Sequence, residues 1–288
     1  MTYEQFRQIH RIQLLIMDDI HRVCVDYGLK YYMIGGTALG AVRHGGFIPW
    51  DPDIDIAMPR DDYEKFVTIY SKELKTELSC HDYRTDRRHY CPHALVSYNK
   101  SKLIFKNLDK SPFLTFGDYG IYVDILPLDK VPNNITLRKK HEKRLSIIKN
   151  LRYYKMCRIC ASNSWLVIQA KVLLSLIIPI SLYRISLWQQ KIAQEYNYLP
   201  QEEATDICST LSHYRYEKLC MPQSIWGAPT LYDFEGRQYY GPKDIKSYLK
   251  KLFGNYMELP SEEHRSISLK NIIYAEWIDS DGKKIVLK

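Results

Sequence analysis

An acidic run that alternates with apolar residues constrains this chain more than any other feature of its sequence. Residues 51–56 read DPDIDI, and on a β-strand Asp53 and Asp55 share one face while Ile54 and Ile56 point into a core. Two neighbouring carboxylates repel each other unless a cation lies between them. Hard oxygen ligands of this kind suit Mg2+ or Mn2+ bound together with substrate phosphates. The run therefore predicts a metal site on a strand.

The segment before this run has the features of a phosphate-binding turn. LKYYMI (29–34) predicts a strand, Gly35 and Gly36 follow it, and TALGAVRH (37–44) predicts a short helix. Two glycines leave backbone N–H groups unhindered beside a helix N-terminus, a setting that accepts phosphate. Thr37 would add its hydroxyl to the turn or cap the helix.

A third carboxylate is predicted further along the chain. Asp124 lies in GIYVDILPL (120–128), an otherwise apolar segment that we expect to form another strand. An unpaired charge inside a strand costs on the order of several kcal/mol. A single aspartate often caps a turn or pairs with arginine, but three placed in this way favour a shared cation.

Four side chains between these aspartates and the glycine turn could contact a bound ligand. Arg43 and His44 end the predicted helix and could reach a diphosphate, although the helix dipole also stabilises charges at a helix end. Phe47 and Trp50 could hold a quaternary ammonium by cation–π attraction. Aromatic residues in such places more often belong to the core.

The order of these elements is that of the nucleotidyltransferase fold, in which metal-bound carboxylates hold a nucleotide's phosphates. GGTALGAVRHGGFIPWDPDIDIAMPRDDYEKF further resembles the signature of the LicD family, to which the fukutin proteins are related. Two later stretches are similar to the same family, FGDYGIYVDILPLDKVP (116–132) and FEGRQYYGPKDIKSYLKKLFGNYMELPSEEHR (234–265). The resemblance covers most of the chain and is weakest in the middle. It implies an α+β fold, a nucleotidyltransferase-like mixed sheet with flanking helices.

The resemblance also implies an activity. Bacterial members of the family transfer phosphocholine or similar phospho-groups to cell-surface glycans, so we expect a hydroxyl of a glycan or glycolipid to attack a CDP-activated donor and CMP to leave. Mg2+ or Mn2+ would be held by Asp53, Asp55 and Asp124, the last of which completes the metal shell or accepts the hydroxyl's proton. The donor's phosphates would be held by Gly35, Gly36, Thr37, Arg43 and His44.

One departure from the family pattern bears on this expectation. Members often carry consecutive aspartates after the tryptophan, whereas this chain has Pro52 between Asp51 and Asp53. Proline lacks an N–H and fixes its own backbone angle, so the approach to the strand is stiffened. Two alternatives stay open: a nucleotidyltransferase that adds a nucleotide to a protein, RNA or small molecule, and a non-catalytic scaffold that binds nucleotide or glycan. On the resemblance alone, Glu235 and Arg237 would contact donor or acceptor.

The charge of the chain favours anionic partners without choosing among them. Its 41 Lys and Arg against 33 Asp and Glu give a formal net charge of +8. No basic stripe with interleaved aromatics indicates nucleic-acid binding, and LRKKHEKR (137–144) is typical of a solvated helix face. The polar, amphipathic start shows no secretory signal, so we expect a cytoplasmic protein.

The seven cysteines lack the even spacing of a disulfide framework, which agrees with a reducing compartment, and most are expected to be small buried hydrophobes. Two groups contain the residue types that bind zinc, a CxxC at 157–160 and a cluster between residues 80 and 93. That cluster consists of Cys80, His81, His89, Cys91 and His93. Neither group has the second pair at finger spacing that favours zinc.

The apolar segment WLVIQAKVLLSLIIPISLYRISLW (165–188) is compatible with three structures. Lys171 interrupts it, Pro179 would kink it, and its uninterrupted apolar part falls short of roughly twenty residues, so a membrane span is disfavoured. A buried helix hairpin is favoured, and peripheral contact with the inner face of the cell membrane is the alternative.

These patterns divide the chain into three parts. Residues 1–135 form the predicted catalytic core, 136–205 a helical segment, and 206–288 a C-terminal part that completes the LicD-type domain. In the core, residues 2–27 predict an amphipathic helix with a capping box. Segments 93–99, 102–107 and 120–128 predict strands of one sheet, which prolines at positions 127 and 132 close.

Overall fold

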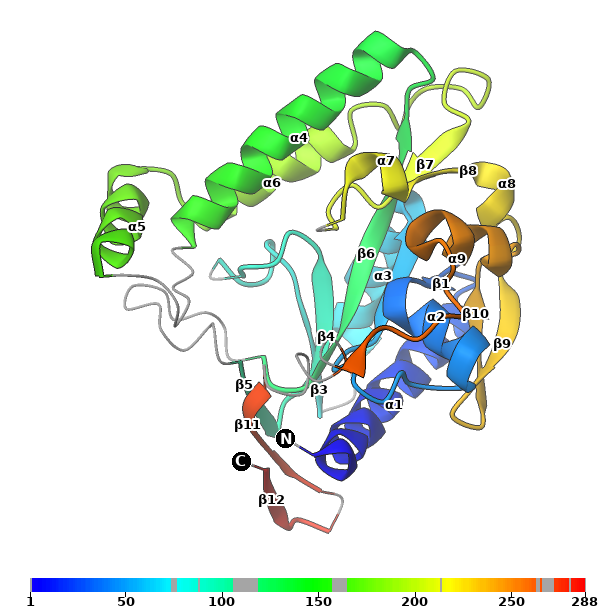
Figure 1. The fold of residues 1–288 in the computed structure, drawn as a ribbon, viewed down its shortest axis with the longest axis vertical. Coiled ribbons are helices and arrows are strands. Elements are labelled where there is room, and N and C mark those ends of the chain that lie inside the picture. The colour runs from blue at the N-terminus through cyan, green and yellow to red at the C-terminus, as the bar shows by residue number, and fades with distance from the viewer. Residues whose placement is uncertain are drawn as a thin grey trace.

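The fold is α+β, as the sequence predicts. The computed structural model describes residues 2–73, 77–87, 89–105, 119–156, 165–212, 214–262, 265, 272–279 and 281–287. A curled mixed sheet runs through the middle of the molecule, with helices on both sides of it, and a small antiparallel sheet lies beside the chain termini (Figure 1).

The central sheet has five strands in the order β1-β2-β6-β4-β3, and β7 and β8 extend it along the far half of β6. Only β2 and β6 are parallel; the other neighbours are antiparallel. The strands are β1 (Tyr32–Met33), β2 (Asp55–Pro59), β3 (Leu78–His81), β4 (Ala94–Tyr98), β6 (Tyr122–Val131), β7 (Asp206–Cys208) and β8 (Cys220–Pro222).

Helix α1 (Tyr3–Asp26) covers this sheet on one side. Thr2 and Gln5 form the predicted capping box, and the apolar residues at helical spacing, Ile9 and Ile16 among them, are fully buried. The other helices are α2 (Gly35–His44), α3 (Arg60–Glu73), α4 (Ile135–Lys155), α5 (Trp165–Ile177), α6 (Leu182–Ala193), α7 (Tyr216–Leu219), α8 (Gln223–Trp226) and α9 (Ile245–Phe253).

The strand predicted at 102–107 does not belong to the central sheet. It is β5 (Ser101–Phe105), which pairs with β11 (Ile272–Ile278), and β11 pairs in turn with β12 (Lys284–Leu287). The prediction of one sheet was wrong because the partner of β5 comes from the far end of the chain. A second hairpin, β9 (Thr230–Phe234) and β10 (Arg237–Gly241), lies beside β1 and α2.

Proline 127 does not close the core either, because β6 continues through it to Val131. The N–H of Asp124 donates to the carbonyl of Ile54, just before β2. The residues that alternate with Asp124 along β6, Ile125 and Pro127, therefore direct their nitrogen away from β2. On the side away from β2, β6 pairs with β4, whose first residue lies opposite Ile125. The missing N–H of Pro127 therefore costs no hydrogen bond between the strands.

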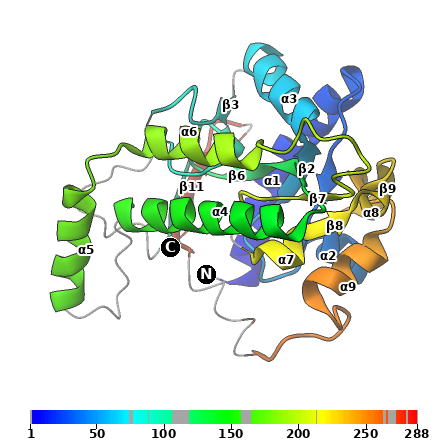
Figure 2. The same ribbon diagram turned by 90° about the horizontal axis from the view of Figure 1, so that it is seen from above.

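The predicted buried hairpin at 165–188 is wrong for its first helix. Helix α5 ends at Ile177 just before the proline, and α6 packs along α4, but the described apolar side chains of α5 are mostly exposed. Figure 2 shows α5 lying across the end of the α4–α6 pair. Within the described residues, no helix combines the length and apolarity needed to cross a membrane.

The described cysteines confirm the expectation of small buried side chains. None forms a disulfide, four are buried, and Cys91 is half-buried. The CxxC at 157–160 lies outside the described residues.

A buried ion pair ties β6 to α3. The guanidinium of Arg60 donates to both carboxylate oxygens of Asp129 at 2.7 and 2.6 Å, and also to Gln190 on α6. Asn197 and Thr210 donate to the same carboxylate. Because every lone pair has a partner, the two charges are tolerated inside the core.

We expect Asp129→Asn to lower the free energy of unfolding by about 3 kcal/mol, because it removes the buried counter-ion of Arg60 and leaves only the half-exposed Glu64, at 3.1 Å, to pair with it. Asp26→Asn, which breaks the exposed Arg22–Asp26 pair on α1, should cost about 0.5 kcal/mol or less. Urea unfolding of both variants measures the contrast. Equal losses would mean that the buried pair does not stabilise the core.

Candidate functional site

The parallel register of β2 and β6 brings two of the predicted aspartates face to face. Asp55 pairs with Asp124, so their side chains leave the sheet side by side. Asp53 lies in the loop just before β2, not on the strand as expected. One ligand oxygen of each of the three lies within 4.8 Å of the others. The three aspartates that the sequence predicts as metal ligands therefore lie close together in the fold. Their roles in metal binding and catalysis stay a prediction.

Burial raises the pKa values of Asp51, Asp53 and Asp55, and repulsion adds to this at Asp53 and Asp55. Burial, followed by the charges of Asp51, Asp55 and Asp124, raises the pKa of Asp53 well above its usual value. Burial and the charge of Asp124 do the same to the pKa of Asp55. Burial raises the pKa of Asp51 to about 6, against a hydrogen bond from Asp53 and the nearby charge of Arg43, which lower it. A raised pKa favours the protonated, neutral form of each of these three side chains.

No lysine or arginine among the described residues forms an ion pair with Asp53 or Asp55. A cluster of buried oxygen ligands that repel one another, and that no protein cation neutralises, fits a divalent metal such as Mg2+ or Mn2+.

The glycine pair fits tightly against this cluster. A Cβ on Gly36 would lie 2.0 Å from Oδ2 of Asp51, and Gly35 has a φ of +55° with its Cβ position 3.5 Å from Oδ2 of Asp55. The helix starts at Gly35 and not at Thr37 as predicted, so the glycines form its first turn. The pair thus lets the helix N-terminus approach the carboxylates closely.

The predicted phosphate donors already have some partners. The Gly35 N–H donates to the hydroxyl of Tyr248 at 2.9 Å, and the Thr37 hydroxyl accepts the N–H of Asp55 at 2.8 Å. Thr37 therefore ties α2 to β2. In a helix first turn, the N–H groups of Gly36 and Thr37 have no intrahelical acceptor, which leaves them aimed at the N-terminal end.

Arg43 and His44 are held by neighbouring groups. Arg43 donates to the carbonyls of Tyr256 and Glu258 at 2.9 and 3.2 Å, which holds that loop against α2. The His44 ring meets the edge of Trp50 at 5.9 Å, and burial lowers the pKa of His44.

The aromatic residues of the loop differ in access. Phe47 is buried, stacked on His10 at 3.7 Å and packed against Phe234, so it belongs to the core and offers no face to a ligand. The guanidinium of Arg265 lies 5.5 Å from the Trp50 ring centre, so a protein cation already uses that ring.

Helix α1 supports the acidic loop, which the sequence did not indicate. His10 bonds to the carbonyl of Asp51, and Gln13 donates to the carbonyl of Pro52, both at 2.8 Å. Burial lowers the pKa of His10 to about 4, so the ring is neutral and its Nε2–H donates. The carbonyl of Pro52, the residue that departs from the family pattern, therefore has a partner on α1.

A second group with metal-ligand chemistry shares Asp124. Cys91, His93 and Asp124 each place a ligand atom within 4.8 Å of the others, and Nε2 of His93 lies 2.8 Å from Oδ1 of Asp124. The other ring nitrogen of His93 is buried without a hydrogen-bond partner. Among the described residues, Cys80, His81 and His89 belong to no such group, and His89 bonds instead to Tyr119 and to the carbonyl of His93. His93 thus orients Asp124, as a histidine does when it holds a metal-ligating carboxylate in place.

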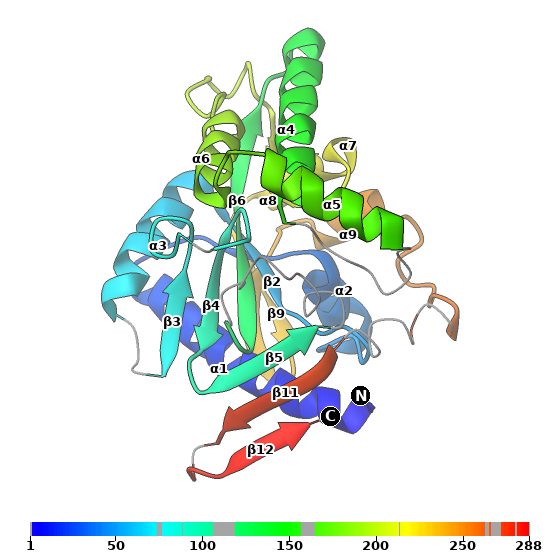
Figure 3. The ribbon, with the colours of Figure 1, turned by 90° about the vertical axis from the view of Figure 1, so that its left-hand side faces the viewer.

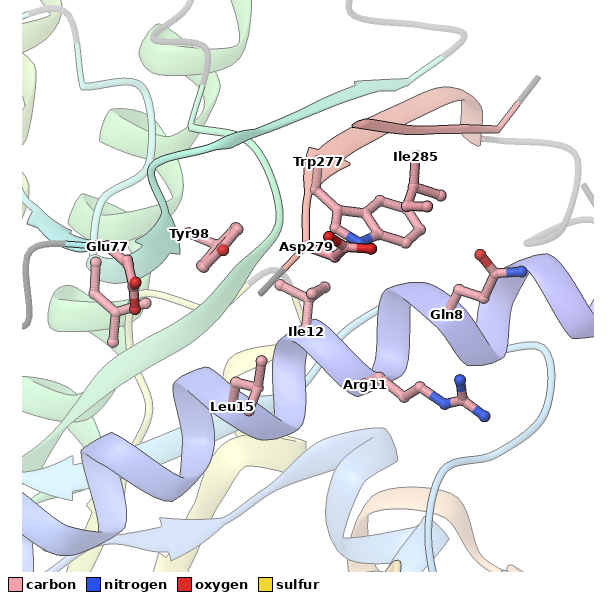
Figure 4. A pocket seen from close by; sticks show the side chains of 10 residues that line it. Gln8, Arg11, Ile12, Leu15, Glu77, Tyr98, Trp277, Asp279 and Ile285 are labelled. Atoms are coloured by element: carbon pink, nitrogen blue, oxygen red, sulfur yellow. The ribbon is translucent and has the colours of Figure 1, made fainter. Parts of the chain in front are cut away.

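Glu235 and Arg237 serve the scaffold. Glu235 occupies the β9–β10 turn with a φ of +52° and accepts the N–H of Phe47, while Arg237 pairs with Asp18 on α1. A cavity of about 590 Å³ lies elsewhere, between α1 and the β11–β12 hairpin, where Ile12, Leu15, Trp277 and Asp279 face it (Figure 4). None of the three aspartates lines it.

Comparisons with known proteins identify the family of this chain. Residues 28–161 match the family model described as LicD/FKTN/FKRP, nucleotidyltransferase domain. The Haemophilus influenzae protein named lipopolysaccharide cholinephosphotransferase LicD is 30% identical over 264 residues, which cover 89% of this chain and 93% of that relative. The chain belongs to the LicD family. As a member it is a phosphotransferase, and its 28–161 segment contains all three aspartates.

Two further relatives match a short segment of the chain. The proteins named ribitol 5-phosphate transferase FKRP from mouse and human are 49% identical over 35 residues, 12% of this LicD-family chain and 7% of each relative.

We expect Gly36→Ala to weaken Mn2+ binding at least tenfold, because the new methyl group would displace the Asp51 carboxylate. Gly28→Ala is the control for the added methyl group, since nothing lies within 4 Å of the Cβ position of Gly28; the φ of +64° at Gly28 means that any loss there is a backbone effect. Titration followed by Mn2+ electron paramagnetic resonance compares them. Unchanged binding in Gly36→Ala would separate the glycine turn from the carboxylates.

The raised pKa of Asp51 predicts a pH dependence. Without divalent cations the folded state retains a proton that the unfolded state releases near its ordinary value of 3.8, so stability falls as pH rises from about 4 through about 6. Relative to Asp51→Asn, the wild type should therefore lose free energy of unfolding across this window in EDTA, and Mg2+ should reverse the trend. A pH-independent difference in EDTA would contradict the assignment.

Proposed function

We propose that this phosphotransferase moves a phospho-substituted group, phosphocholine or a polyol phosphate, from a CDP-activated donor to a hydroxyl of a cell-surface glycan or glycolipid. The hydroxyl oxygen forms a bond to the distal phosphorus of the donor. The bond between that phosphorus and the bridging oxygen breaks, and CMP leaves. The observation that supports this proposal best is the trio of half-buried carboxylates: Asp55 and Asp124 pair where β2 and β6 meet, and Asp53 joins them from the loop before β2.

The residues of the site suit this transfer. Asp53 and Asp55 would hold Mg2+ or Mn2+, and Asp124 would complete the shell or take the proton of the acceptor hydroxyl. A bound divalent cation supplies positive charge to the donor's phosphate oxygens. The N–H groups of Gly36 and Thr37, at the start of α2, would donate to the same phosphates, with Arg43 close by.

Names of relatives support the choice of group without deciding it. The Haemophilus influenzae relative is named for transfer of cholinephosphate to lipopolysaccharide, and the mouse and human relatives for transfer of ribitol 5-phosphate. The two groups differ beyond the phosphate, so the donor panel of an assay has to include both.

The proposal predicts CMP release from one CDP-linked donor. Purified protein is incubated with Mg2+ and CDP-choline, CDP-ethanolamine, CDP-ribitol or CDP-glycerol, and separately with CTP, and CMP and pyrophosphate are quantified. Asp53→Asn and Asp55→Asn should each lower CMP release by about 100-fold or more, because several kcal/mol of charge stabilisation are lost. EDTA should have the same effect.

Asp61→Asn is the control, since this aspartate is exposed in the first turn of α3. It should leave CMP release unchanged. Pyrophosphate from CTP would assign nucleotide transfer instead. Full activity of both site variants, or no turnover of any donor with glycan extract present, would reject the proposed role of the carboxylates.

A further inference from the structure

Helix α5 exposes apolar side chains to an extent that soluble proteins rarely allow. Trp165, Leu166, Leu173, Leu176 and Ile177 are 58–72% exposed, and none of the described side chains of α5 belongs to either apolar core of the protein. Contiguous exposed apolar surface of this kind marks an interaction site.

The neighbours of α5 enlarge this surface. The helix contacts α4, whose last turn carries the half-exposed Tyr153 and Tyr154, and α6 adds the exposed Leu187 and Trp188. Figure 3 shows α5 projecting across the upper part of the molecule, with the ends of α4 and α6 beside it. Tyrosine and tryptophan combine an apolar ring with a polar atom, a property that suits the boundary between water and lipid.

The charge around the surface is of one sign. Between residues 143 and 194 the sequence contains no Asp or Glu and nine basic residues, namely Lys143, Arg144, Lys149, Arg152, Lys155, Arg158, Lys171, Arg184 and Lys191. Some are used internally: Arg152 is buried and bonds to Ser186 and Gln189. Others remain at the surface: Arg184 is exposed in the first turn of α6, and Lys143 and Lys191 are exposed farther along α4 and α6.

We propose that α5, with the adjoining ends of α4 and α6, docks the protein on an anionic lipid bilayer. The apolar side chains would enter the boundary between headgroups and acyl chains, and the surrounding lysines and arginines would face acidic headgroups. A second copy of the chain is the poorer partner, because a symmetric contact would bring two basic surfaces together. The proposal does not depend on the donor, the acceptor or the metal.

The experiment is co-sedimentation of the full chain with vesicles. We expect binding to phosphatidylcholine vesicles that contain phosphatidylglycerol, and much weaker binding to phosphatidylcholine alone or at high salt. The double variant Leu166→Glu/Leu176→Glu should lower the partition coefficient about tenfold or more for each leucine. Trp165→Phe should retain binding but reduce the fluorescence blue shift that vesicles induce, with Trp188 as the other reporter on this surface.

Leu15→Glu is the matched control, because Leu15 is 52% exposed on α1, away from this surface. It should bind vesicles as the wild type does, and circular dichroism checks that every variant is folded. Asp53→Asn should also bind normally, which keeps this test separate from that of the catalytic proposal. Equal partition of the double variant, absence of binding to anionic vesicles, or an α5-dependent dimer in light scattering would overturn the proposal.

Discussion

The close approach of three carboxylates at the junction of two parallel strands is the constraint that the surrounding elements have to meet. The β2–β6 register places Asp55 beside Asp124, and the loop before β2 adds Asp53. Buried groups of like charge favour protonation or separation. The fold prevents separation by fixing the backbone on which they stand: Thr37 holds the N–H of Asp55, and Tyr248 holds the turn at Gly35. A bound cation would relieve the electrostatic repulsion between these carboxylates.

The supports of the site come from distant parts of the chain. Helix α1 holds the carbonyls of the acidic loop through His10 and Gln13, and the β9–β10 turn holds the N–H of Phe47 through Glu235. These contacts explain why the polar face of α1 carries buried histidine and glutamine side chains. They also explain how Pro52 is accommodated, since its carbonyl has a partner and its missing N–H is not required.

Local patterns in the sequence were sufficient to predict the elements of the site but not its surroundings. Alternating aspartates, a glycine pair and an isolated charge in an apolar strand have direct physical meanings, and the fold brings Asp53, Asp55 and Asp124 together. Pairing between distant segments has no such local signal, so β5 was placed in the wrong sheet. The sequence indicates His93 only as one residue of a Cys/His cluster, because its contact with Asp124 depends on the pairing of β4 with β6. The apolar composition of α5 predicted a buried helix, but most of its apolar side chains among the described residues are exposed.

Strand β6 and the helices around it connect the acidic centre to the basic, apolar surface of α5. Asp124 stands near the start of β6, and five residues later Asp129 is bound by Arg60, which also contacts Gln190 of α6. Helix α6 then packs on α4, which contacts α5. Among the described residues, each step is a shared strand, a packing contact or a buried ion pair. If α5 rests on a bilayer, these contacts set the height of the carboxylates above the lipid, so an acceptor anchored in the same membrane would need little search to reach them.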